Sequence, residues 1–180
     1  MRYGVVKIYT MSTAESNDNC YFDVKDTNGS VLDHFMLGVP VARFEKGYPF
    51  IMKAQSFFNK SNFNTYDFFE PTMAFPVFST RAAGALREKV SSQMTFFPAK
   101  VDVNGSLYEV FAGVVLNRKS VFERVGDYEV RVRDGVVIGD DDLIVRDLDN
   151  PQFFFATESM RLLCDSLRLN ILFKNFSMMK

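Results

Sequence analysis

Eleven aromatic residues fall between Phe44 and Phe78, a stretch of only 35 residues. One glycine and three prolines interrupt this stretch, and it keeps neither the helical period of 3.6 residues nor the strand period of two. Each buried aromatic ring removes about 150–250 Å² from water, so these rings dominate any core they enter. We therefore expect irregular structure with short elements, and about eight of the eleven rings in a core, because a folded monomer seldom exposes a large apolar patch.

The chain is long enough for one well-buried core. It has 180 residues, of which 47% are apolar and 24% are charged, as in ordinary globular proteins. We expect a single globular domain, residues 1–180. One further arrangement stays open, in which an aromatic-rich half, 1–78, packs on an αβ half, 79–180.

The rest of the sequence mixes strand patterns with two helical patterns. Alternating apolar and polar residues predict strands, and apolar residues three and four positions apart predict helices. The predicted strands span 2–11, 21–25, 31–37, 100–103, 106–111, 128–133, 136–138, 143–148, 153–156 and 170–176. The predicted helices span about 80–91 and 158–168, each opened by a hydroxyl residue at its N-cap. We expect an α+β fold with mixed, largely antiparallel sheets and two or more short helices.

Two dipeptides predict hairpins. Asn104-Gly105 lies between runs of strand-forming residues and favours a type I′ turn, whose twist suits the flanking strands. Asp134-Gly135 lies in a similar position and predicts a second hairpin between 128–133 and 136–138.

Side chains suited to catalysis are scarce. The chain has one histidine, His34, and two cysteines, Cys20 and Cys164. Nucleophilic catalysis needs a nucleophile held beside a base, and no motif around Cys20 and His34 supports such a pair. We expect His34 to make a surface hydrogen bond beside Asp33, and Cys164 to lie in the apolar stripe of the last helix. The sequence predicts no enzymatic activity, no catalytic residues, no cofactor and no metal.

Three consecutive carboxylates, Asp140, Asp141 and Asp142, form the most acidic run of the chain. Short spacing of carboxylates suits hard cations, but the order of an EF-hand loop is missing. A solvated turn is the favoured interpretation. A patch that attracts a basic partner is the second, because surface charge steers association, and a metal site is the third.

A second candidate surface lies inside the aromatic stretch. Phe57, Phe58, Phe63 and Tyr66 alternate with Asn, Ser, Lys and Asp residues. Loops of this composition suit recognition, since aromatic rings anchor a partner while small polar groups adapt to it. We therefore list these four residues, with the three aspartates, as candidate partner-binding residues.

Several short motifs resemble one known family. They are Gly47-Tyr48-Pro49-Phe50, Ser79-Thr80-Arg81-Ala82, 97–101 (FPAKV), 144–148 (IVRDL), 154–158 (FFATE) and 167–173 (LRLNILF). Together they resemble the eleventh immunity-protein family of bacterial polymorphic-toxin systems over residues 45–176. The resemblance implies an immunity protein that binds a cognate toxin or effector and occludes its active site without turnover. The alternative is a small-molecule-binding domain or enzyme whose pocket is lined by the aromatic segment.

Charge and hydropathy limit the compartments in which the protein can act and the partners that it can bind. The net charge of −1 offers no broad basic surface for nucleic acid. No run approaches 18 apolar residues, and Lys7 interrupts the first apolar run too early for a signal peptide. We expect a cytoplasmic protein with a toxin as partner, without nucleic-acid or membrane binding. The oligomeric state stays open.

Overall fold

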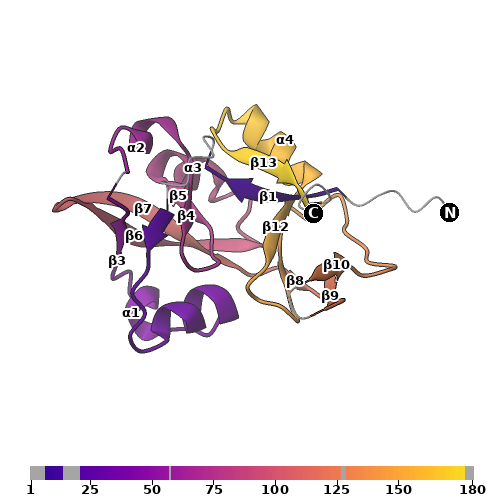
Figure 1. The fold of residues 1–180 in the computed structure, drawn as a ribbon. Helices are drawn as coiled ribbons and strands as arrows, with labels where there is room; N and C mark the ends of the chain where they lie inside the picture. Colours follow the sequence, from indigo (N-terminus) through magenta and orange to yellow (C-terminus); the bar gives the residue numbers. More distant parts are fainter. Residues whose placement is uncertain (1–6, 14–20, 57, 127–128, 177–180) are drawn as a thin grey trace.

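The computed structural model describes residues 7–13, 21–56, 58–126 and 129–176. It confirms the expected α+β fold. A closed barrel of six strands packs against a five-stranded sheet, and short helices lie around both (Figure 1).

The barrel holds most of the aromatic segment. Its strands, in their order around the barrel, are β2 (Tyr21–Asp23), β3 (Phe50–Ala54), β6 (Met94–Val103), β7 (Ser106–Val115), β5 (Val77–Ser79) and β4 (Phe68–Pro71). β2 with β4 and β3 with β6 run parallel, and the other pairs are antiparallel. Inward side chains such as Phe22, Met52 and Phe69 are 0% exposed. The barrel thus joins strands from both sides of residue 79.

The sheet joins the first strand of the described chain to four strands from its second half. Its order is β13 (Leu172–Asn175), β1 (Ile8–Ser12), β12 (Phe154–Thr157), β11 (Ile144–Asp147) and β8 (Arg118–Lys119). Two helices pack between this sheet and the outside of the barrel: α3 (Thr80–Leu86) and α4 (Glu158–Ser166). Ser79 and Thr157 accept a hydrogen bond from the backbone N–H three residues on, as their N-cap positions predict. α3 ends at Leu86, short of the predicted end at residue 91.

The predicted strand over 31–37 is wrong. The segment forms η1 (Leu32–Leu37), a π-helix that ends at Gly38 with φ of +74°. The carboxylate of Asp26 accepts hydrogen bonds from the backbone N–H groups of Val31 and Leu32, and so satisfies donors at the helix start. Phe35 is 0% exposed, so burial of its ring in the barrel core favours the helix over local strand preference. Two further short helices are α1 (Ala42–Glu45) and α2 (Asn62–Thr65).

One predicted hairpin is confirmed and the other is wrong. β6 and β7 pair through Asn104 and Gly105, which have φ of 52° and 88°. After Asp134-Gly135 the chain forms no strand over 136–138. Instead, β10 (Val130–Val132) pairs in antiparallel orientation with the preceding strand, β9 (Phe122–Arg124). The physical reason is packing, because Val136 and Ile138 contribute to a small core around Phe122.

No helix within the described ranges is long and apolar enough to cross a membrane.

Candidate functional site: an uncovered barrel face and its cleft

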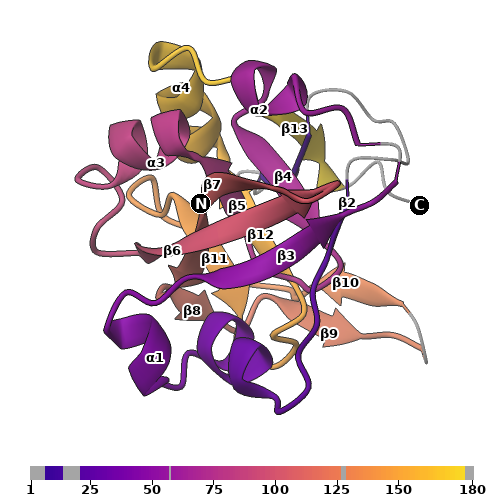
Figure 2. The same ribbon diagram turned by 90° about the vertical axis from the view of Figure 1, so that its left-hand side faces the viewer.

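The outer face of the β6–β7 hairpin is covered at one end and open at the other. In Figure 2, β3 and β6 face the viewer and no helix lies across them. Strand register places Ile51, Lys100 and Glu109 in one row across β3, β6 and β7, and Lys53, Asp102 and Leu107 in the next. We call these six residues the barrel face. Ile51 and Leu107 are 57% and 52% exposed.

A cleft of about 530 Å³ adjoins the barrel face. Three segments form its walls: the α2 region, the start of α3 and the hairpin end of β7. The lining residues are Phe63, Asn64, Asp67, Ser79, Thr80, Arg81, Leu107, Tyr108 and Glu109. Two of them, Leu107 and Glu109, also belong to the barrel face, so the cleft and the face form one continuous surface.

Asp67 is buried at the cleft and held by several hydrogen bonds. Its side chain is 1% exposed, and its Oδ1 accepts hydrogen bonds from Ser79 Oγ (2.6 Å) and Arg81 Nε (3.1 Å). Its Oδ2 accepts from the backbone N–H of Asn170 (2.7 Å) and from Arg81 Nη2. A buried carboxylate needs such partners to offset its desolvation. Asp67 thereby holds the Arg81 guanidinium in one orientation, while the Arg81 side chain stays 60% exposed.

Two aromatic rings form the apolar wall. Phe63 and Tyr108 stack with centroids 4.5 Å apart and planes within 9° of parallel. Both residues are half-buried, so part of each ring remains open to the cleft. The cleft therefore combines an aromatic wall with a fixed, exposed cation, both within reach of one bound group.

The structure separates the predicted aromatic candidates. Phe63 lines the cleft, as a recognition residue would. Phe58 and Tyr66 are only 6% and 5% exposed and belong to the barrel core, so as surface anchors they are wrong. Their rings fill the barrel because burying aromatic surface stabilises the fold more than exposing the rings beside their polar neighbours would. Phe57 lies outside the described residues.

The acidic turn is anchored through one of its three carboxylates. Asp142 accepts hydrogen bonds from Lys119 Nζ (2.5 Å), Asn117 Nδ2 (2.9 Å) and the backbone N–H of Gly139 (2.7 Å). Burial alone would raise the pKa of Asp142, but these hydrogen bonds outweigh it and hold the pKa below its usual value. The side chains of Asp140 and Asp141 are exposed. Asp142 is thus structural, and only the other two carboxylates are free to steer a partner.

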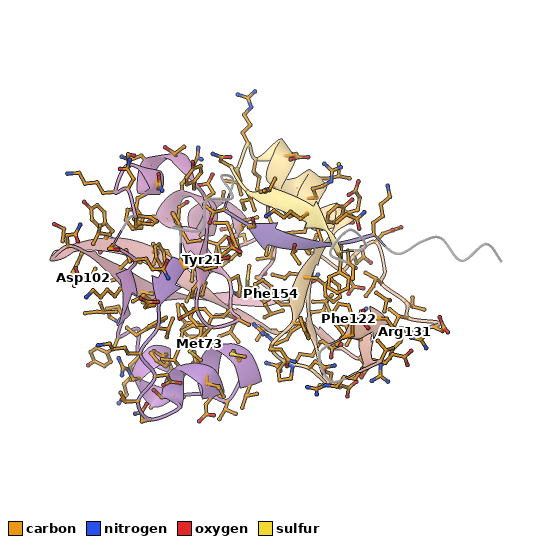
Figure 3. All side chains as sticks on the ribbon, in the orientation of Figure 1. Tyr21, Met73, Asp102, Phe122, Arg131 and Phe154 are labelled. Carbon is orange, nitrogen blue, oxygen red and sulfur yellow. The ribbon has the colours of Figure 1, made fainter. Side chains whose placement is uncertain are left out.

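The structure does not bring the acidic turn and the cleft together. Phe63 contacts Tyr108 near the tip of the β6–β7 hairpin, whereas Asp142 contacts Asn117, beyond its open end. Ten residues of extended strand span roughly 30 Å. In Figure 3, Asp102 marks the hairpin tip on one side of the molecule, and Arg131 lies on the other.

Neither His34 nor Cys164 lines the cleft, and Cys20 lies outside the described residues. His34 is 3% exposed, so the predicted surface hydrogen bond is wrong. Its ring packs against Phe35, Phe44 and Phe97. Its Nδ1 lies within hydrogen-bonding distance of the Val39 carbonyl and the Val41 N–H. Burial lowers the pKa of His34. Cys164 lies in the apolar face of α4, as predicted, and burial raises its thiol pKa to about 12.

Two adjacent charged residues on β11, Arg146 and Asp147, are buried and form structural hydrogen bonds. Arg146 is 0% exposed and donates from Nη1 to the carbonyls of Ala74 (2.9 Å) and Pro151, and burial lowers its pKa to about 9. Asp147, also 0% exposed, accepts from backbone N–H groups, including that of Val121 (2.7 Å). Each charge is stabilised by backbone dipoles from other segments, so the pair links the barrel, η1 and the sheet.

The comparisons with known proteins neither support nor oppose these assignments. The chain matches no protein-family model, and it matches no curated protein. The resemblance to the eleventh immunity-protein family therefore stays a prediction.

Sequence reasoning missed most of the cleft. The sequence predicts a helix start at Arg81 and a hairpin strand over Tyr108 and Glu109. Nothing in the spacing of these residues links them to Phe63 or Asp67. One signal was available, since a polar and charged run at 79–81 opens a helix directly after a buried strand. Its partner carboxylate lies twelve or more residues earlier in the chain, and only the fold shows that the two meet.

Proposed function

We propose that the protein is an immunity protein that binds a cognate toxin or effector in the cytoplasm and occludes its active site without turnover. The barrel face and the adjoining cleft form the contact surface. The observation that carries this proposal is the exposure of Ile51 and Leu107 at 57% and 52%, whereas outward side chains elsewhere on the barrel, such as Phe68, Phe78 and Phe96, are buried under the second layer.

The composition of the barrel face supports a protein partner. Two exposed aliphatic side chains stand among Lys53, Lys100 and Glu109, so the surface is neither wholly apolar nor uniformly charged. Interfaces of this kind gain affinity from a few apolar anchors and gain specificity from the charges around them. Occlusion needs only such a surface, and no reacting group.

Asp140 and Asp141 add a second element to the proposal. They lie apart from the barrel face, so they act through long-range attraction and not through contact. Exposed charges are felt over about 8 Å at physiological salt and farther at low salt. We expect Asp140→Asn with Asp141→Asn to slow toxin association by about tenfold at low salt, with the difference closing as salt rises. Association rates measured at two ionic strengths test this.

Growth protection tests the proposed function directly. The product of the neighbouring gene in the native genome is the first candidate for the toxin, and it is expressed in a sensitive host together with the wild-type protein or a variant. Ile51→Glu with Leu107→Glu should abolish protection and weaken binding by about 1,000-fold, because two apolar anchors at an interface centre contribute about 2 kcal/mol each and every 1.4 kcal/mol is tenfold in affinity.

A matched control separates contact from solubility. Leu148→Glu with Leu162→Glu places the same charges at two sites of similar exposure, 55% and 53%, away from the barrel face. This variant should protect as well as wild type. Equal protection by both double variants would contradict the contact surface, and failure of the wild type to protect would contradict the function.

A further inference from the structure

We propose that the cleft between Phe63, Arg81 and Tyr108 binds a small molecule composed of a planar ring and one anionic group, either a carboxylate or a phosphate. The anion pairs with Arg81, and the ring lies against Phe63 and Tyr108. This inference does not depend on toxin binding, because it follows from the geometry of the cleft alone.

The first step is the state of Arg81. Asp67 takes two of its N–H groups, from Nε and Nη2, and the side chain is still 60% exposed. A guanidinium has five N–H donors, so the remaining donors point away from Asp67. A guanidinium that is already fixed loses little side-chain entropy when it binds an anion in a forked geometry.

The second step is the sign of the charge that the cleft accepts. Asp67 is surrounded by donors from Ser79, Arg81 and Asn170, so its two oxygens are already engaged. Glu109 lies at the rim in register with Lys100, whose charge offsets it. The exposed donors of Arg81 therefore favour an anion over a cation.

The third step is the ring. Phe63 and Tyr108 stack on each other within 9° of parallel, and both line the cleft while half-buried. A planar ligand gains from stacking or edge contact with such a pair, by about 0.5–1.5 kcal/mol beyond its buried area. The volume of about 530 Å³ lies inside the range of small-molecule sites, about 300–1,000 Å³.

Calorimetric titration of the full chain with four probes tests the proposal. Adenosine 5′-monophosphate and salicylate each carry a ring and an anion, one a phosphate and the other a carboxylate. Adenosine carries only the ring, and inorganic phosphate carries only the anion. We expect at least one of the first two probes to bind tenfold or more tightly than both partial probes. Adenosine differs from adenosine 5′-monophosphate only by the phosphate, so the ratio of their affinities measures what the anion contributes. Equal binding of all four, or no heat from any at millimolar concentration, would overturn the proposal.

Variants locate the bound probe. Arg81→Gln should weaken binding about tenfold or more, whereas Arg131→Gln should leave it unchanged. Arg131 is a fair control because it is also an exposed arginine paired with a carboxylate, 62% exposed and bonded to Glu123, and it lies on β10 away from the cleft (Figure 3).

A second variant covers the case in which Arg81→Gln unfolds the chain. Tyr108→Leu keeps the pair of Asp67 and Arg81 and removes only the ring, so it should weaken the ring-bearing probe severalfold without affecting binding of inorganic phosphate. Unchanged affinity for the ring-bearing probe in a folded Tyr108→Leu protein would overturn the assignment of the ring to this wall.

Discussion

The two ends of the outer face of β6 differ in what covers them. At one end Met94 and Phe96 lie under α3 and the sheet and are 1% and 8% exposed. At the other end Lys100 and Asp102 point in the same outward direction and have no helix across them. One strand thus belongs both to a core and to a surface. The difference teaches that the second layer covers only part of the barrel, and that the uncovered part is where binding is proposed.

The local sequence of β6 agrees with this division. Outward positions are apolar where the second layer packs and charged where it stops, while the inward positions from Phe97 to Val103 are all apolar. Alternation with a period of two applies to the whole strand, but the chemistry of its outward residues changes halfway. That change is the sequence-level trace of the boundary of the second layer.

The largest expected effect comes from deleting a ring under the second layer. Phe96→Ala should lower the free energy of unfolding by about 3–5 kcal/mol, because it removes a buried ring that contacts Phe78 edge-on at 5.4 Å and leaves a cavity. Lys100→Ala, on the same strand and the same side, should change it by no more than about 0.5 kcal/mol. Urea denaturation measures both. Similar losses for the two variants would mean that the uncovered end is packed as well.

A smaller effect is expected where the hairpin meets its neighbours most closely. A Cβ at Gly113 would lie 2.7 Å from Met94 Sδ and 3.0 Å from Pro76 Cγ. Gly113→Ala should therefore destabilise the protein by about 1–3 kcal/mol through overpacking. Gly84 on α3 has nothing within 4 Å of such a Cβ, so Gly84→Ala should instead stabilise by about 0.5–1 kcal/mol, as alanine does in a helix. Thermal unfolding of the two variants compares them, and a loss of stability in both would argue against close packing as the cause.

The smallest expected effect is a pH dependence at the inner face of β6. His34 packs against Phe97, and burial lowers its pKa. The unfolded chain then binds a proton at a higher pH than the folded chain does. Stability should be fully present above the unfolded value of about 6.5 and should fall as pH drops below it towards the folded pKa. His34→Gln should flatten this slope in denaturation curves between pH 5 and 8, and an unchanged slope would assign it to other groups.

The sequence predicted the elements whose local signals agree with their packing. The hairpin at Asn104-Gly105 formed because a turn that needs positive φ coincides with two alternating strands. The helix capped by Thr157, with Cys164 in its apolar stripe, formed for the same reason. The abundance of aromatic residues also predicted a core, and eight of the ten rings that the structure describes between Phe44 and Phe78 are buried.

Only the tertiary structure decided the rest, because there local preference and packing disagree or distant residues must meet. Strand-like residues around Phe35 form a helix, since the barrel core takes the ring. Asp67 and Arg81 meet because β4 and β5 pair and turn the start of α3 back over the carboxylate. The composition of a segment determines how much apolar surface it must bury. Which side chains then remain exposed depends on how far the second layer reaches across the barrel. Contacts between segments distant in the chain decide that reach, and the change along β6 is only its local trace.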